Sequence, residues 1–160
     1  MPQALIWGAS GGIGSALVRQ LKSEGWRVFA AARHESDILS VADITFPFDA
    51  TQPATASSIA ALVAAESDGL DLVVYAAGGL TAAPLEKVDP NAWRATIASN
   101  LDGAFVASHA SLNLLRDDGH LMVIGAYVHK ITLPRMGPYA AAKAGLEAFM
   151  AVLKKEHRRS

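Results

Sequence analysis

The chain has 160 residues, of which 51% are hydrophobic and 18% charged, and its formal net charge at pH 7 is −1. This length and hydrophobicity predict a single folded domain, residues 1–160, and exclude a disordered chain. The balanced charge excludes a nucleic-acid or membrane partner, and the absence of cysteine excludes disulfides, zinc–thiolate sites and iron–sulfur clusters. Since no apolar run approaches the length of a membrane span, we expect a cytoplasmic protein.

The first predicted elements are a strand, a glycine turn and a helix. Residues 3–7 are an apolar run typical of a buried strand, and Gly8, Gly12 and Gly14 then give the spacing G-x-x-x-G-x-G. A helical period follows and ends at Gly25, where helices commonly need a left-handed residue. Glycines let the backbone approach a pyrophosphate, and amide groups at the helix start point at its charge. The turn therefore predicts dinucleotide binding, although a glycine-rich turn without a ligand has the same spacing.

Strands and helices are predicted to alternate along the rest of the chain. We expect strands at 26–32, 44–48, 70–76 and 120–125, and helices at 53–66, from 89, from about 101 to 116, and from 137 onward. Pro47 suits an edge strand, and Asp89 followed by Pro90 is typical of a helix start. Alternation of this kind predicts an α/β fold with a doubly wound parallel sheet, covered on both faces. Its expected strand order is 3-2-1-4-5, with a ligand crevice between strands 1 and 4.

Some side chains carry predictions about packing and about metals. We place five apolar residues in the core: Trp26, Ile59, Leu62, Val63 and Trp93. His109 and Asn113 stand four residues apart on a predicted helix, but a metal site needs a third ligand that the sequence does not offer. We therefore expect no metal, and a packed or interface position for this pair.

Tyr139 and Lys143 are the first candidates for catalysis. They are four residues apart on the last predicted helix, so their side chains share one face. An ammonium group close to a phenol favours the ionised phenol, which helps it to exchange a proton with a substrate. The spacing alone is common. Its place after the fifth strand is more informative, because it brings the pair to the sheet edge where the glycine turn would hold a dinucleotide.

The order of these motifs resembles the short-chain dehydrogenase/reductase family. The resemblance runs from Met1 to about Met150 and includes Gly8-x-x-x-Gly12-x-Gly14, Asp49, Ala77-Gly78, Asn100-Leu-x-Gly103-x-Phe105 and Tyr139-x-x-x-Lys143. It implies a Rossmann-like cofactor site made of Gly8, Ser10, Gly12, Ile13, Gly14, Arg33, Asp49, Ala77, Gly78, Tyr139 and Lys143. The glycines would bind the pyrophosphate and Asp49 the adenine. By the same resemblance Asn100 would hold a proton-relay water, Tyr139 would donate the proton, and Lys143 would bind ribose and tune Tyr139.

Three features depart from the family pattern. The family's Asn-Asn-Ala-Gly is Tyr75-Ala76-Ala77-Gly78 here. The family's catalytic serine, thirteen residues before the tyrosine, is Ala126, and losing a donor to developing charge typically costs about two to three orders of magnitude in rate. Tyr127, His129 and Thr132 are the alternatives for a substitute donor. Family members also continue into further strands, so we expect either a sheet that lacks them, with strand 5 as a bare edge, or a longer polypeptide.

A looser resemblance concerns the dihydropteridine reductases, a divergent branch of the family. It depends on Trp7 before the first glycine, on Ala126, and on Ala76-Ala77-Gly78-Gly79 after strand 4. It implies a quinonoid substrate that accepts a hydride and a tyrosine proton without help from a serine.

The end of strand 2 indicates which dinucleotide is preferred. An acidic residue there selects NAD through the ribose 2′-hydroxyl, whereas an arginine accommodates a 2′-phosphate. Ala32 takes the acidic position and Arg33 follows it, with His34 beside it, so NADP(H) is favoured over NAD(H). Against this preference, Gly11 stands where many NADP-dependent family members carry a basic residue.

The sequence therefore predicts an NAD(P)(H)-dependent oxidoreductase that transfers a hydride to or from a small carbonyl or quinonoid substrate. The alternative is a catalytically reduced dinucleotide-binding or regulatory protein of the same fold. The family resemblance also implies a homo-oligomer through the helices after strands 4 and 5.

Overall fold

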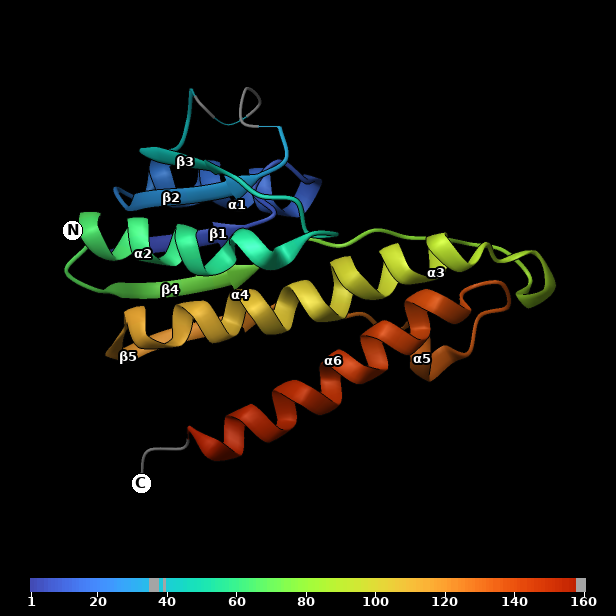
Figure 1. Cartoon of the computed structure of the whole chain (residues 1–160). Helices are drawn as coiled ribbons and strands as arrows, with labels where there is room; N and C mark the ends of the chain where they lie inside the picture. Colours follow the sequence, from blue (N-terminus) through green and yellow to red (C-terminus); the bar gives the residue numbers. More distant parts are fainter. Residues whose placement is uncertain (35–37, 39, 158–160) are drawn as a thin grey trace.

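A computed structural model gives the fold of the chain and describes residues 1–34, 38 and 40–157. Its centre is a sheet of five strands in the order β3-β2-β1-β4-β5 (Figure 1). The strands are β1 (Gln3–Trp7), β2 (Arg27–Ala32), β3 (Ile44–Pro47), β4 (Leu70–Tyr75) and β5 (Leu115–Val123). All four pairings are parallel. The predicted fold class and strand order are confirmed, and Pro47 lies in an edge strand as expected.

Helices and turns make the connections between the strands. The chain places α1 (Gly12–Ser23) between β1 and β2, and η2 (Pro53–Thr55) with α2 (Ala56–Glu66) between β3 and β4. Between β4 and β5 it forms η3 (Leu85–Lys87), α3 (Pro90–Ile97), the π-helical turn η4 (Ala98–Asp102), α4 (Gly103–Ser111) and η5 (Leu112–Leu114). After β5 come α5 (Val128–Ile131) and α6 (Gly137–Glu156). Within the described residues, no helix combines the length and the apolarity needed to cross a membrane.

The two faces of the sheet are covered unequally. Side chains of α2, α4 and α6 pack on one face against Trp7, Phe29 and Tyr75, whereas α1 packs on the other face. Successive strand residues alternate between these two clusters, as the pleat requires. On the α1 face Met122 of β5 is 52% exposed, which differs from the expected cover of both faces. A helix about 10 Å wide covers roughly two strands that are about 4.8 Å apart, so α1 leaves β5 open.

The segment between β4 and β5 differs from its predicted boundaries. One continuous helical segment begins with α3, runs through the π-helical turn into α4, and ends at Ser111 rather than at Arg116. β5 begins at Leu115, five residues before the predicted start at His120. Arg116 explains the early start, because its guanidinium donates to both carboxylate oxygens of Asp71 at 2.8 and 2.9 Å and so holds the chain beside β4. Such a contact between distant residues leaves no local signal in the sequence.

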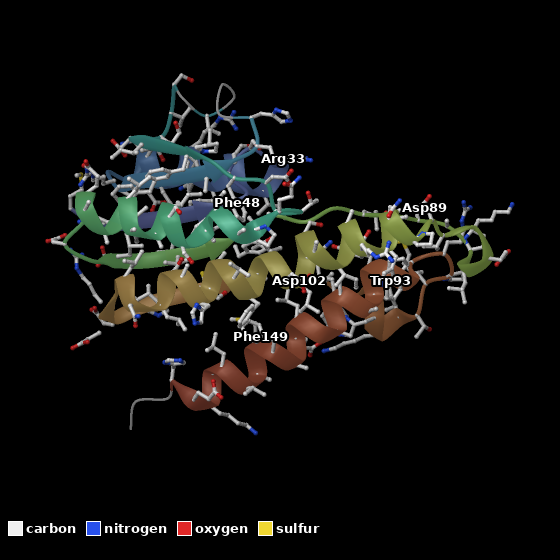
Figure 2. All side chains as sticks on the ribbon, viewed as in Figure 1. Arg33, Phe48, Asp89, Trp93, Asp102 and Phe149 are labelled. Carbon is white, nitrogen blue, oxygen red and sulfur yellow. The ribbon has the colours of Figure 1, made fainter. Side chains whose placement is uncertain are left out.

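Core placement is confirmed for some of the predicted residues and wrong for others. Ile59 and Val63 of α2 are buried, but Leu62 is 55% exposed, because α2 buries only a narrow stripe. Trp26 is half-buried at the rim of the α1 cluster. Trp93 is 39% exposed, because α3 extends beyond the end of the sheet (Figure 2).

The predicted start of α3 is confirmed. The Asp89 carboxylate accepts hydrogen bonds from the backbone amides of Asn91 and Ala92, and Pro90 occupies the first turn, where its missing N–H costs nothing.

Candidate functional site

The glycine turn after β1 is closely packed. Gly8 has φ +82°, and a Cβ there would lie 2.4 Å from the Ala77 nitrogen. A Cβ at Gly14 would lie 2.2 Å from the Gly8 carbonyl oxygen, so both positions require glycine. Gly12 is different, because nothing lies within 4 Å of its Cβ position. The α1 helix begins after Gly11 without a side-chain cap, so its first amide groups face the open side of the turn.

A cavity of about 230 Å³ lies at the carboxyl edge of the sheet. The segments that follow β1, β2, β3 and β4 all contribute to its wall. Six of the residues predicted for the cofactor line it: Gly8, Ser10, Arg33, Asp49, Ala77 and Gly78. Figure 2 shows Arg33 at this edge, with its side chain at the surface. The structure therefore brings together, at one edge, residues that lie up to 70 positions apart in the sequence.

Asp49 is held in one orientation by its own loop. Its Oδ1 accepts hydrogen bonds from the Thr51 amide at 2.9 Å and from the Thr51 hydroxyl at 2.8 Å. These two donors hold the pKa of the Asp49 carboxyl below its usual range, so the group stays ionised at neutral pH. A fixed, ionised carboxylate at the cavity wall suits an amino-group donor of a ligand.

Asn100 lies behind the loop that follows β4. It belongs to η4, is 1% exposed, and donates through Nδ2 to the carbonyl oxygens of Gly79 at 2.6 Å and Thr96 at 2.9 Å. Its Oδ1 is buried and accepts no hydrogen bond from the described residues. A Cβ on Gly78 would lie 2.4 Å from this oxygen. Asn100 therefore presents an unused acceptor toward Gly78 of the cavity wall.

Tyr139 and Lys143 share one face of α6. The Lys143 ammonium is 5.5 Å from the centre of the Tyr139 ring and donates to the Ile124 carbonyl oxygen at 2.8 Å. Lys143 is 5% exposed, and this burial lowers the pKa of its ammonium. Because Ile124 directly follows β5, the bond places the pair at the same edge of the parallel sheet as the glycine turn.

A second cavity, of about 420 Å³, opens beside Lys143. Ala126 lines it, so the position of the family serine faces this space with a methyl group only. Of the three alternatives for a substitute donor, Tyr127 lines the cavity and is 73% exposed. His129 instead bonds through Nε2 to Glu147, and Thr132 is an exposed residue with φ +49°. Tyr139 lines neither cavity.

Two other features of the structure do not belong to this site. A hollow of about 600 Å³ lies between the beginning of β5 and the end of α6, at the opposite edge of the sheet. Among the described residues, no three His, Asp or Glu side chains gather in a way that could hold a metal ion. His109 is exposed and lies against the Phe105 ring, with 5.8 Å between the ring centres.

Comparison with known proteins decides the family. The family model described as short chain dehydrogenase matches residues 2–160. The chain belongs to the short-chain dehydrogenase family. The resemblance predicted from the order of the motifs is thereby confirmed.

Named members of the short-chain dehydrogenase family are similar over almost the whole chain. The chain is 30% identical to the 3-oxoacyl-(acyl-carrier-protein) reductase FabG of Escherichia coli, covering 96% of this chain and 66% of that protein. It is 27% identical to the 2,3-dihydro-2,3-dihydroxybenzoate dehydrogenase of Bacillus subtilis, with 94% and 62% covered. A solved short chain dehydrogenase from Shigella flexneri superposes with a TM-score of 0.91 at 25% identity, covering 98% of this chain and 68% of that one. The chain thus spans 62–66% of the length of these two curated relatives.

The structure also reveals wall residues that the sequence did not single out. Ser99 lines the first cavity, and its hydroxyl accepts a hydrogen bond from the Gly79 amide at 3.0 Å. Ser99 directly precedes Asn100, which the sequence did single out, so its place in the cavity wall could have been predicted. Thr51 lines the cavity as well, and the spacing Asp49-x-Thr51 is typical of an Asx turn.

Proposed function

We propose that this chain functions as an NAD(P)(H)-dependent oxidoreductase that transfers a hydride to or from a small carbonyl or quinonoid substrate. The main support is the Lys143 ammonium, which bonds to Ile124 after β5 and lies over the Tyr139 ring. In the proposal the Tyr139 phenol is the proton donor, and it lies with a cation beside it at the same sheet edge as the glycine turn.

The residues of the first cavity fit a dinucleotide. The close packing at Gly8 and the open space at Gly12 leave backbone amides at the start of α1 free to face a pyrophosphate. In the proposal Gly8, Gly12 and Gly14 hold the pyrophosphate and Asp49 holds the adenine amino group. Ser10 and Ile13 of the same turn also bind the cofactor. Ala77 and Gly78 provide the wall against which the middle of the dinucleotide lies.

The dinucleotide, when bound, supplies or takes up the hydride. The chain's own residues handle the proton. The Tyr139 hydroxyl gives its proton to the substrate oxygen, and the nearby Lys143 ammonium stabilises the negative charge that develops on the phenol. The free Oδ1 of Asn100 accepts a hydrogen bond from a water that returns a proton toward Tyr139. These roles are those that the family resemblance implies, and the positions of the donors and acceptors on α6 and η4 support them.

Arg33 supports NADP(H) over NAD(H). It follows β2, lines the first cavity and is exposed, so its guanidinium is accessible to a 2′-phosphate. The preceding residue, Ala32, offers no carboxylate to a ribose 2′-hydroxyl.

Steady-state oxidation of NADPH with a panel of carbonyl and quinonoid compounds tests the proposal. Turnover with at least one compound is expected, and Tyr139→Phe should abolish it while NADPH binding persists, because the variant removes only the hydroxyl. Binding is followed by the tryptophan fluorescence of the protein. Unchanged turnover in Tyr139→Phe would contradict the proposed proton donor.

A second candidate is a catalytically reduced dinucleotide-binding protein with a regulatory role. Ala126 favours it, because the second cavity has no serine hydroxyl beside Lys143. Tight NADPH binding without turnover on any compound would support this candidate. Ala126→Ser then decides whether the missing hydroxyl is the cause, since gained turnover would show that the rest of the site is competent.

The proposed assembly is a homo-oligomer through α4 and α6. Phe105 of α4 is 50% exposed and packs edge-on against Phe149 of α6, with 6.0 Å between the ring centres. Val152 of α6 is 55% exposed. Together they form an apolar surface that a second copy would cover.

A further inference from the structure

Tyr75 ends β4 with a buried phenol at the place where the sequence departs from the family pattern. It is 1% exposed, and its hydroxyl donates to the Ser99 carbonyl oxygen at 2.5 Å. Burial, with a smaller contribution from the Asp102 carboxylate, raises the pKa of Tyr75. The phenol therefore stays protonated and remains a donor at all working pH values.

Gly103 makes room for this phenol. A Cβ on Gly103 would lie 2.2 Å from the Tyr75 hydroxyl oxygen. The hydroxyl thus reaches the helix backbone through a gap that only glycine leaves. Tyr75 and Gly103 form a matched pair between β4 and the start of α4.

The bond reaches the helix at its irregular turn. In η4 the Gly103 amide donates to the Ala98 carbonyl, five residues back, instead of to the Ser99 carbonyl, as an α-helix requires. Tyr75 supplies a donor to the Ser99 carbonyl from outside the helix. The Ser99 hydroxyl meanwhile accepts from the Gly79 amide, so Ser99 is fixed on both sides.

The next residue is Asn100, whose Oδ1 is the unused acceptor behind Gly78. We infer that Tyr75 is a positioning residue, whose hydroxyl fixes the Ser99 carbonyl and thereby holds the Asn100 Oδ1 toward Gly78. The inference rests on the proposed function, in which Asn100 orients a water of the proton relay. Its physical basis is that a π-helical turn is strained and needs tertiary contacts to persist.

Kinetics of Tyr75→Phe provide the first test, since this change removes the hydroxyl and keeps the ring. We expect kcat for NADPH oxidation to fall roughly ten- to a hundredfold, as for a small misplacement of a group in a proton relay, with KM for NADPH near its original value. In Asn100→Ala, adding Tyr75→Phe should cause no further loss, because Tyr75 acts through Asn100. Losses that multiply in the double variant would overturn the inference.

Ser111→Ala is the matched control. Ser111 also carries a buried hydroxyl that donates to a helix carbonyl, that of Ala107, at 2.7 Å, and lies at the far end of α4. The control should lower the thermal midpoint as Tyr75→Phe does and leave kcat unchanged. If kcat fell equally in both variants, lost stability alone would explain the effect of Tyr75→Phe, and the inference would be overturned.

A measurement without substrate separates this inference from the proposed function. The side-chain amide of Asn100, assigned by its loss in Asn100→Ala, gives an NMR signal that reports its bonds to Gly79 and Thr96. In Tyr75→Phe this signal should shift and exchange faster with solvent, and in Ser111→Ala it should not. Gly103→Ala, which displaces the phenol without removing it, should give the same change. An unchanged signal in Tyr75→Phe overturns the inference, whereas absent turnover in the parent protein overturns only the proposed function.

Discussion

Gly8 and Gly25 have almost the same positive φ angle in different surroundings. Their φ values are +82° and +81°, but only Gly8 has atoms close to its Cβ position, the nearest being 2.4 Å away. Gly25→Ala should therefore cost about 1–2 kcal/mol of unfolding free energy from the left-handed conformation alone. Gly8→Ala should cost clearly more and abolish NADPH binding, because the turn must also move away from Ala77. Urea unfolding measures both changes, and equal losses in the two variants would contradict the packing described for the turn.

Arg33 and Arg19 provide a matched pair for testing cofactor choice. Arg33 lines the first cavity, whereas Arg19 lies on the exposed side of α1. Arg33→Ala should weaken NADPH binding about tenfold or more, since a guanidinium–phosphate pair is lost, and leave NADH binding nearly unchanged. Arg19→Ala should weaken neither. Calorimetric titration with both dinucleotides measures this. Equal weakening of NADPH and NADH by Arg33→Ala would reject the proposed contact with the 2′-phosphate.

At the scale of elements, the helix between β4 and β5 shows what a sequence can predict. The start at Asp89 followed by Pro90 was predictable, because capping depends on neighbours in the chain. The π-helical turn was not, although it contains Asn100 of the predicted motif. The hydrogen bonds that tie this turn to the rest of the fold are made with Tyr75 and Gly79, which lie 20 or more residues away. The site residues that directly follow strands could be predicted, because the end of a strand can be recognised from neighbouring residues in the sequence.

In the loop after β5, too, part of the arrangement could be predicted from the sequence and part could not. The sequence left Tyr127, His129 and Thr132 as equal alternatives for a substitute donor. The structure separates them through Glu147, 18 residues further along the chain, which binds the ring of His129. Only the packing of α5 on α6 brings these residues together, so no spacing rule could have separated the three.

The contact between α5 and α6 is expected to make stability depend on pH. The Lys130 ammonium, at 2.8 Å, and the His129 ring, at 2.5 Å, hold the pKa of Glu147 below its ordinary value of 4.5. Because the folded pKa lies below the unfolded one, this stabilisation is present above about pH 4.5 and is lost as pH falls through the folded value. Glu147→Gln should lower the thermal midpoint at neutral pH and flatten its fall in acid. Glu156→Gln, near the end of the same helix, should leave that fall as steep as in the parent protein.

At the scale of the whole molecule, the strand order was predictable because its causes are general. Alternating strands and helices require crossovers of one hand, and near-continuous apolar runs mark the central strands β1 and β2. The uneven cover of the sheet was not predictable, because it depends on how many helices reach each face. The exposed Met122 of β5 follows from that arrangement.

The apolar surface on α4 and α6 leads to the last prediction. Phe149 extends from α6 toward α4, where its ring meets the half-exposed ring of Phe105 (Figure 2). Phe105→Asp should convert the proposed homo-oligomer to a monomer in light scattering, because a charge buried between two copies costs several kcal/mol. Leu62→Asp is the control, since Leu62 is 55% exposed on α2 and should leave the mass unchanged. A monomeric mass of the parent protein at micromolar concentration would instead show that this surface does not bind a second copy of the chain.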